Sequence, residues 1–478
     1  MSLAKKAIKN GSWFAFFKSI SQVISWVVTI IVARILSPSD YALSAMATLV
    51  TGYAEIFSEM GIGASIIQKK KLSSNDLSSI FWFSFCVSIL FAAACFPVAY
   101  LTAEIFNEPQ VVPLVQAVSI LFIFTGLAVV PLSLLKRDLD YKTIGLIEMQ
   151  STIIACLGML LIAYGDGGVW TLIGGRIIRG FVRLLLVYRA TKWRPTIHFN
   201  FEEAKIYLRF GVVVALSSSV FYVFEISDRF FAGRAWELEM LGYYLFAMQL
   251  AKMATDKIVS TINHVTYSLF SRYQDDKEKF NEYYLSTVKI TALLAFPVFV
   301  MGFMFGDDLI PLLLGNKWLP MITLFEFLCL VQIITTLNAI VNYVHMAIGK
   351  PMRGLYFYAA CAFFMSISFY FAVQYEKEMI LIPWFTTYLL ITLIWLVYTN
   401  RKLGITNLKY IATLISPVAG VSIMYLVVVL LRYSESLLAF NSVLVFAIEV
   451  IVALLSYFIF LWFFDRNILQ SVKSLKAR

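Results

Sequence analysis

Long runs of apolar residues alternate with short polar segments along the whole chain. Most runs reach the roughly 20 residues that a helix needs to cross the hydrocarbon core of a bilayer. In lipid, every backbone polar group must be bonded within its own segment, so such runs predict membrane-spanning helices. The expected fold is therefore an all-α polytopic membrane protein with about fourteen transmembrane helices. The predicted spans are 12–33, 41–66, 80–102, 113–134, 145–164, 169–188, 209–233, 241–266, 286–306, 319–346, 354–374, 379–399, 410–431 and 441–463.

The first pair of apolar runs recurs about 200 positions later. Ala33-Arg34 corresponds to Gly233-Arg234, and a Phe-Pro-Val tripeptide stands at 96–98 and again at 296–298. Two homologous halves are the usual construction of a secondary transporter, with the binding site between the repeats. The pattern predicts two pseudo-symmetric six-helix lobes and two additional C-terminal helices. The expected domains are an N-terminal lobe (1–190), a cytoplasmic linker (191–206), a C-terminal lobe (207–400) and the two extra helices with a cytoplasmic tail (401–478).

Composition and charge agree with this class. Apolar residues make up 60% of the chain and charged residues only 14%, which no soluble core of this size could accommodate. The net charge of +10 does not indicate a nucleic-acid partner, because the basic residues follow the topology. Of the 39 Lys and Arg residues, 25 lie in the termini and in the loops on their side, and five lie in the opposite loops. The positive-inside rule therefore predicts cytoplasmic N- and C-termini, which agrees with an even number of spans.

No pattern of enzymatic chemistry is present in the sequence. The five cysteines all fall inside apolar runs, the three histidines are scattered, and there is no phosphate-binding glycine-rich loop followed by Lys-Ser/Thr. No loop is long enough for a folded soluble domain. We therefore expect a transporter rather than an enzyme, with no cofactor and no metal.

Several short motifs, in chain order, resemble the colanic acid exporter-like polysaccharide transporters. That family comprises bacterial flippases of lipid-linked oligosaccharides within the multidrug/oligosaccharidyl-lipid/polysaccharide exporter superfamily. The similarity extends over about the first 350 residues, and the last two or three spans match only in hydropathy. The motifs are Ala33-Arg34, the Gly61–Gln68 segment, Arg137-Asp138-Leu139-Asp140-Tyr141 with Ile144-Gly145, Arg209-Phe210-Gly211, Asp228 with Gly233-Arg234, and Gly315-Asn316-Lys317-Trp318.

The resemblance implies two lobes around a central cavity that opens alternately to each side of the membrane. It implies an undecaprenyl-diphosphate-linked oligosaccharide repeat unit as cargo, moved from the cytoplasmic to the outer leaflet of the bacterial inner membrane. The pathway would be exopolysaccharide, capsule or O-antigen biosynthesis, with a polysaccharide polymerase and a chain-length regulator as further expected partners. The alternative is a cation-coupled multidrug antiporter of the same superfamily, for which twelve spans and an acidic cavity would be expected.

Charged residues inside the predicted spans are the candidate site residues. Each costs roughly 2.5–3.5 kcal/mol at the bilayer centre, so each should face a cavity or a partner of opposite charge. The basic and acidic sets nearly balance, so structural ion pairing remains open beside a role in transport. The candidates for substrate binding are Arg176, Arg179, Arg183, Lys252, Lys18 and Arg229. The candidates for ion coupling or pairing are Glu55, Glu59, Glu225, Asp228 and Asp256.

Two pairings are compatible with helix depth. Lys18 and Glu59 lie at similar depth on the first two spans, and Glu225 and Lys252 lie at similar depth on the seventh and eighth. A cavity-lining role for the second pair stays open, because the resemblance implies that the first two helices of each lobe line the cavity. Glu55, deeper in its span, is a candidate proton carrier.

The sixth span carries three arginines at spacings of three and four. At 3.6 residues per turn, Arg176, Arg179 and Arg183 fall within roughly a 60° arc and form one cationic stripe. The stripe predicts either a binding surface for the cargo's diphosphate or a clamp onto acidic residues of adjacent helices. Glu148 on the fifth span is a candidate partner for Arg183, whereas the sequence offers no evident partner for Arg179.

Overall fold

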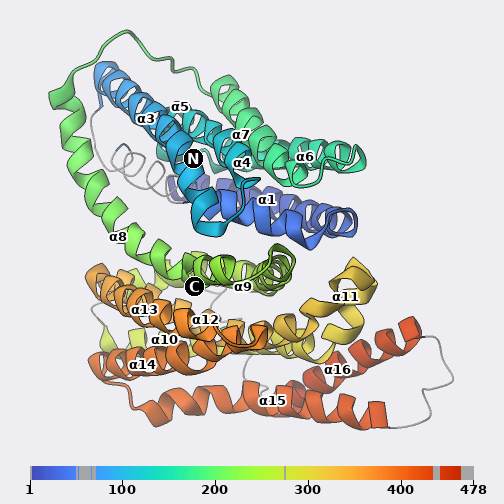
Figure 1. Cartoon of the computed structure of the whole chain (residues 1–478). Helices are drawn as coiled ribbons and strands as arrows, with labels where there is room; N and C mark the ends of the chain where they lie inside the picture. The colour runs from blue at the N-terminus through green and yellow to red at the C-terminus, as the bar shows by residue number, and fades with distance from the viewer. Residues whose placement is uncertain are drawn as a thin grey trace. The chain divides into compact units, whose positions relative to one another are not determined.

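The computed structural model describes residues 3–49, 52, 66, 72–273, 276–433 and 442–464, and α-helices dominate this part of the chain (Figure 1). The α-helices with assigned bounds are α1 (Leu3–Ile35), α3 (Ser74–Phe106), α4 (Val111–Val118), α5 (Ile120–Arg137), α6 (Tyr141–Tyr164), α7 (Trp170–Ala190), α8 (Phe201–Ala235), α9 (Leu238–Arg272), α10 (Lys277–Met304), α11 (Gly306–Leu314), α12 (Ile322–Ala347), α13 (Pro351–Ala372), α14 (Leu389–Leu403), α15 (Asn407–Tyr433) and α16 (Ser442–Phe464).

The predicted spans are confirmed as helices wherever the structure describes them. Ten helical segments of the described chain are long and apolar enough to cross a membrane. Three further predicted spans coincide with α7, α8 and α9, which are helical but carry more charge. The remaining predicted span, 41–66, lies mostly outside the described residues.

The helix–turn–helix that the sequence repeats is present at both positions. α1 ends at Ile35 and the next helix starts at Pro38, while α8 ends at Ala235 and α9 starts at Leu238. The two junctions are therefore 200 residues apart, as the sequence motifs predict.

Local chemistry explains the first of these turns. The Ser37 hydroxyl and backbone amide both donate to the Asp40 carboxylate, at 2.7 and 2.8 Å. Pro38 follows Ser37 at the first helical position, where its fixed φ suits a helix and its missing N–H is not needed. The Ser-Pro-Ser-Asp segment thus ends one helix and starts the next within three residues.

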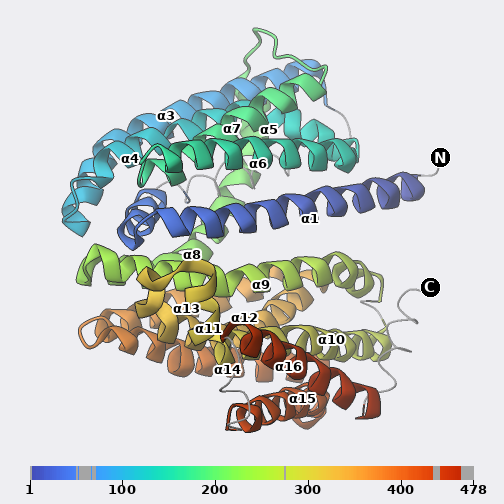
Figure 2. The same ribbon diagram turned by 90° about the vertical axis from the view of Figure 1, so that its right-hand side faces the viewer.

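The chain divides into two compact units, residues 1–245 and 246–478. In the first unit, α6 packs between α1 and α7, and α5 packs against α3 and α7 (Figure 2). Buried Leu132, Ile147 and Val187 join α5, α6 and α7 in one apolar cluster. The predicted division of the chain at 191–206 rests on the sequence repeat and stays a prediction.

In the second unit, α12 contacts α10, α13 and α14. The α15–α16 hairpin packs onto α10, where the Tyr457 hydroxyl donates to the Leu293 carbonyl at 2.9 Å. Pro97 and Pro297, at equivalent places in the two halves, both lie inside continuous helices, α3 and α10.

Candidate functional site

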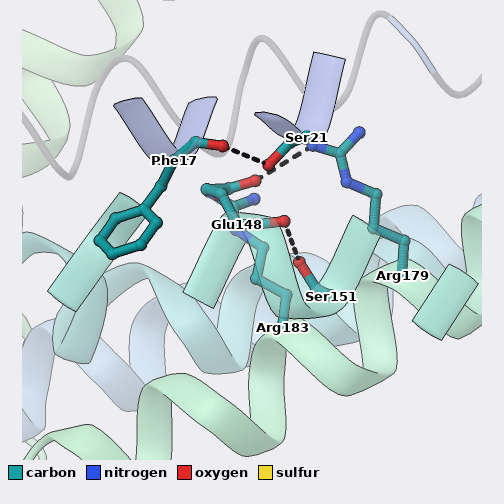
Figure 3. Close-up of polar contacts among 6 residues, drawn as sticks. All are labelled: Phe17, Ser21, Glu148, Ser151, Arg179 and Arg183. Carbon is teal, nitrogen blue, oxygen red and sulfur yellow. Dashed lines mark hydrogen bonds and ion pairs between the residues drawn. The ribbon is translucent and has the colours of Figure 1, made fainter. Parts of the chain in front are cut away.

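The arginine stripe of α7 meets a single carboxylate on α6. Arg179 donates from Nη2 to Oε2 of Glu148 at 3.1 Å, and Nε of Arg183 lies 2.8 Å from Oε1 of the same group (Figure 3). Each carboxylate oxygen therefore faces one guanidinium group. Glu148 neutralises only part of the charge, because it is shared between two cations.

The sequence offers no evident partner for Arg179, and the structure supplies one. Its partner is Glu148, which the sequence assigned to Arg183 alone. Arg179 and Arg183 are four residues apart and so stand one above the other on the same face of α7, and one carboxylate between them can reach both. The clamp onto an adjacent helix is thus present. It does not bury Arg179, whose side chain keeps 53% of its surface exposed.

Glycines set the distance between α6 and α7. A Cβ atom added at Gly174 would lie 2.7 Å from a methyl group of Ile162, and one added at Gly175 would lie 2.2 Å from Met159. On α6, Gly158 allows the same close approach to Ile178. Gly174 and Gly175 of α7 are therefore occupied by packing against α6, and this packing brings Glu148 within reach of both arginines.

The other side of α6 is packed against α1. A Cβ atom at Gly145 would lie 3.0 Å from the backbone of Phe14, so the two helices touch at this point. Nearby hydroxyl groups are satisfied by their own helices. Ser21 donates to the Phe17 carbonyl at 2.8 Å and Ser151 to the Glu148 carbonyl at 3.1 Å, and Figure 3 shows both. The carboxylate of Glu148 is thus directed to the arginines.

Of the other candidate site residues in the first unit, the structure describes some and not others. Arg176 is exposed on α7, in the same stripe as Arg179. Lys18 is exposed on α1, with its ammonium 5.9 Å from the ring of Phe14. Its predicted partner Glu59, and the candidate proton carrier Glu55, lie outside the described residues.

Asp228 is buried and serves the α8–α9 turn. Its Oδ2 accepts a hydrogen bond from the Tyr244 hydroxyl at 2.7 Å, and its Oδ1 accepts from the Arg229 amide at 2.8 Å. The carboxylate thereby ties the end of α8 to the start of α9, with the Arg229 side chain half-buried beside it. A coupling role for Asp228 stays a prediction.

The remaining candidates lie on α8 and α9. Glu225 and Lys252 belong to different units, and their pairing stays a prediction. Asp256 is exposed on α9, one turn beyond Lys252.

A further ion-pair centre lies in the second unit and is not among the candidates that the sequence provides. Arg432, at the end of α15, donates to Glu449 from Nε at 3.0 Å and from Nη2 at 2.9 Å, and to Asp308 on α11 at 2.7 Å. Its guanidinium also lies 5.2 Å from the centre of the Phe305 ring. In the sequence, Arg432 directly follows the predicted span 410–431 and is one of the five cations in the loops opposite the termini. The signal that could have found it is Glu449, an acid inside the last span that requires a cation at its own depth.

Comparison with known proteins assigns the chain to a family. A family model described as "Polysaccharide biosynthesis protein" matches residues 31–323, which is more than half of the chain. The chain belongs to the polysaccharide biosynthesis protein family. Among curated members, it is similar to the lipopolysaccharide biosynthesis protein WzxC of Escherichia coli (strain K12), with 25% identity over 340 residues. That match covers 71% of this chain and 69% of WzxC.

Solved structures show which fold this polysaccharide biosynthesis protein has. The lipid II flippase MurJ, in an inward closed conformation, matches with a TM-score of 0.78 and 13% identity over 95% of this chain and 99% of that structure. An inward-facing multidrug resistance MATE family transporter of the MOP superfamily matches with a TM-score of 0.59 and 15% identity, over 80% and 94% of the two chains. The protein is thus a multi-pass membrane protein with the fold of these transporters.

Proposed function

We propose that this protein moves undecaprenyl-diphosphate-linked oligosaccharide repeat units from the cytoplasmic to the outer leaflet of the bacterial inner membrane. It works by alternating access, as a transporter rather than an enzyme, with both termini in the cytoplasm. The product serves exopolysaccharide, capsule or O-antigen biosynthesis, in concert with a polymerase and a chain-length regulator. The observation that carries this proposal is the family match over residues 31–323, together with the MurJ fold over 95% of the chain.

The names of the similar proteins support the cargo class. WzxC is a lipopolysaccharide biosynthesis protein, and MurJ is a lipid II flippase. A bulky glycan on a lipid carrier cannot cross the hydrocarbon core unaided, because its polar groups lose their hydrogen bonds to water there. A protein of this family with this fold and an intramembrane cationic stripe is suited to lower that barrier.

In this proposal, the α7 stripe receives the anionic part of the cargo. The stripe places three guanidinium groups on one face of α7, and Arg179 keeps 53% of its side-chain surface exposed although it pairs with Glu148. Guanidinium groups bind phosphate oxygens through two parallel N–H bonds, which suits them to a diphosphate. Arg179 is the contact residue because its side chain is the more exposed of the two that pair with Glu148. Glu148 and Arg183 hold it in position.

A cation-coupled multidrug antiporter is the second candidate, and the match to the MATE family transporter favours it. A drug antiporter of cationic substrates requires acidic binding groups. The stripe on α7 instead presents three arginines, two of which pair with Glu148, and guanidinium groups suit an anionic cargo.

Deletion of the gene in its host tests the proposal. We expect lipid-linked repeat units to accumulate on the cytoplasmic side and surface polysaccharide to be lost, with both restored by the intact gene. Drug susceptibility, measured in the same strains, should not change. Normal polysaccharide in the deletion strain, combined with increased susceptibility to cationic drugs, would favour the antiporter instead.

A further inference from the structure

The segment between α7 and α8, residues 191–200, is fastened along the beginning of α3. We call this segment the strap. The Thr196 amide donates to Oγ of Ser78 at 3.1 Å, and the indole Nε1 of Trp82 donates to the Thr196 carbonyl at 2.8 Å. Further along, the Asn200 amide donates to Oγ of Ser79 at 3.1 Å. The strap therefore does not leave the helices as a free loop but stays at the level of the first two turns of α3.

Arg194 fixes the start of the strap. Its guanidinium donates to the carbonyls of Tyr188, Thr191 and Trp193 at 2.8–2.9 Å. The Tyr188 carbonyl lies in the last turn of α7, where carbonyl groups have no partner within the helix, and the other two lie just beyond it. The same guanidinium lies 5.4 Å from the centre of the Tyr188 ring. The chain thus turns directly at the end of α7 and runs sideways.

The opposite side of the strap is apolar and uncovered. Ile197 is 100% exposed, Phe199 is 55% exposed, and Phe201, the first residue of α8, is 51% exposed. They stand at every second position, while the intervening Asn200 bonds to α3 through its backbone. Contiguous exposed side chains of this size mark a surface that is covered by a partner or by lipid.

Helix lengths place the strap at the edge of the hydrocarbon core. α7 has 21 residues, and at 1.5 Å per residue it is about 31 Å long, close to the roughly 30 Å thickness of the core. Residue 191 therefore lies where the core ends. Tyr188, Trp193 and Trp82 cluster at this level, and tyrosine and tryptophan prefer the membrane–water boundary.

The positive charge around the end of α7 indicates which kind of surface covers the apolar row of the strap. Arg189, Lys192 and Arg194 are exposed around the end of α7, and the nearest carboxylates in sequence are Glu202 and Glu203, beyond the strap. Juxtamembrane basic residues attract anionic lipids on the cytoplasmic leaflet, the side to which the positive-inside rule assigns this segment. A hydrophobic row beside cationic groups at the boundary of the core is complementary to that lipid surface.

We propose that the strap is an interfacial membrane anchor. Ile197, Phe199 and Phe201 insert among the acyl chains of the cytoplasmic leaflet, and the cations at the end of α7 contact the phosphate groups of anionic lipids. The anchor holds the end of α7 and the start of α8 at a fixed depth. It depends on the protein being a membrane protein and not on the identity of the cargo.

Spin labelling of the full-length protein in lipid nanodiscs that contain anionic lipid tests this proposal. Cys86 is the exposed native cysteine of the described chain, so the background is Cys86→Ser. Labels are attached in Ile197→Cys and Phe199→Cys, with Lys192→Cys as the control on the same strap. Collisions with oxygen, which concentrates in acyl chains, are compared with collisions with a water-soluble nickel chelate.

We expect labels at 197 and 199 to collide several-fold more with oxygen, relative to the nickel chelate, than the label at 192. Equal ratios at all three positions would place the apolar row in water and overturn the proposal. Protection of 197 and 199 from both reagents would mean that protein covers them, and it would overturn the proposal as well.

A photo-crosslinking residue in place of Phe199 gives an independent result in living cells. A lipid adduct supports insertion into the leaflet, whereas a protein adduct as the main product contradicts it. This measurement needs no cysteine background, so it remains informative if a labelled variant is poorly produced.

Discussion

Arg179 and Arg183 share the carboxylate of Glu148, but their surroundings differ. Arg183 keeps 28% of its side-chain surface exposed, about half the fraction of Arg179. If Arg179 is removed, Glu148 keeps its more buried partner, Arg183. If Arg183 is removed, Glu148 keeps only the more exposed partner, Arg179. The same ion cluster can thus contain one arginine that mainly supports the fold and one that is available to a ligand.

We therefore expect Arg179→Gln to lower polysaccharide export about 10- to 100-fold at normal protein level. This is the loss of roughly 1.5–3 kcal/mol that a hydrogen bond to a charged group contributes. Arg179→Lys keeps the charge but loses the two-pronged geometry, so it should fall between Arg179→Gln and the unmodified protein. Export and membrane protein level are measured together, with Arg401→Gln as a control on an exposed arginine of α14 that has no role in the proposal.

Two results would remove Arg179 from the transport site. One is unimpaired export in Arg179→Gln, and the other is loss of the protein itself. A fall in protein level for Arg183→Gln alone would agree with its more buried place beside Glu148.

Arg432 makes a second residue-scale test possible, this time of stability. Glu449 keeps only 5% of its side-chain surface exposed, so Arg432→Gln leaves a buried carboxylate without a charged partner. We expect a loss of about 1–3 kcal/mol in stability and a lower melting temperature of the purified protein. The double variant Arg432→Leu/Glu449→Leu should recover most of the loss, because replacing a buried pair by apolar residues is often neutral.

Lys279→Gln is the matched control, since it breaks an ion pair with Asp276 that is exposed on both sides. Such pairs contribute at most about 1 kcal/mol. If Arg432→Gln melted at the same temperature as Lys279→Gln, the Arg432 centre would not stabilise the α15–α16 hairpin.

At the scale of elements, the hydrophobic pattern predicts where helices lie but not which faces meet. The helix α7 and the junctions at Ile35 and Ala235 follow from run length and turn residues, which are local properties. The pairing of Arg179 with Glu148 could not be predicted, because it depends on the rotation of α6 about its axis. That rotation is set by the contacts of Gly158, Gly174 and Gly175 with neighbouring side chains.

The contact between the first hairpin turn and α9 is an element-scale prediction. A Cβ atom at Gly242 would lie 1.9 Å from the Pro38 carbonyl oxygen, a backbone atom that no side-chain rotation can move. We expect Gly242→Ala to separate the two segments at a cost of about 1–3 kcal/mol, seen as a lower melting temperature. Gly11→Ala is the control, because nothing lies within 4 Å of the added atom.

The control should be neutral or slightly stabilising, since alanine favours a helix by up to about 1 kcal/mol over glycine. Equal melting temperatures for the two variants would show that the Pro38 turn and α9 do not touch as described.

At the scale of the whole molecule, the repeat and the ordered motifs carried most of the information. Motifs such as Gly315-Asn316-Lys317-Trp318 indicated this family, and the family match over residues 31–323 confirms it, while the fold agrees with that of MurJ. The site was predicted only in part. The spacing of the arginines predicts the stripe, but it does not show which charges line a transport path, and Glu55 and Glu59 lie outside the described residues. The sugar is not encoded in any motif, because a polyhydroxylated cargo can be bound by many arrangements of polar groups.

Reconstitution of the purified protein tests the central claim most directly. Liposomes that carry the host's lipid-linked repeat unit in both leaflets are made with and without the protein, and a sugar-cleaving enzyme is added outside. The proposal predicts that the enzyme reaches nearly all of the repeat unit when the protein is present and about half without it, the outer leaflet's share of a bilayer. Arg179→Gln should slow the approach to completion. The same half-complete cleavage with and without correctly folded protein would contradict the assignment as a flippase.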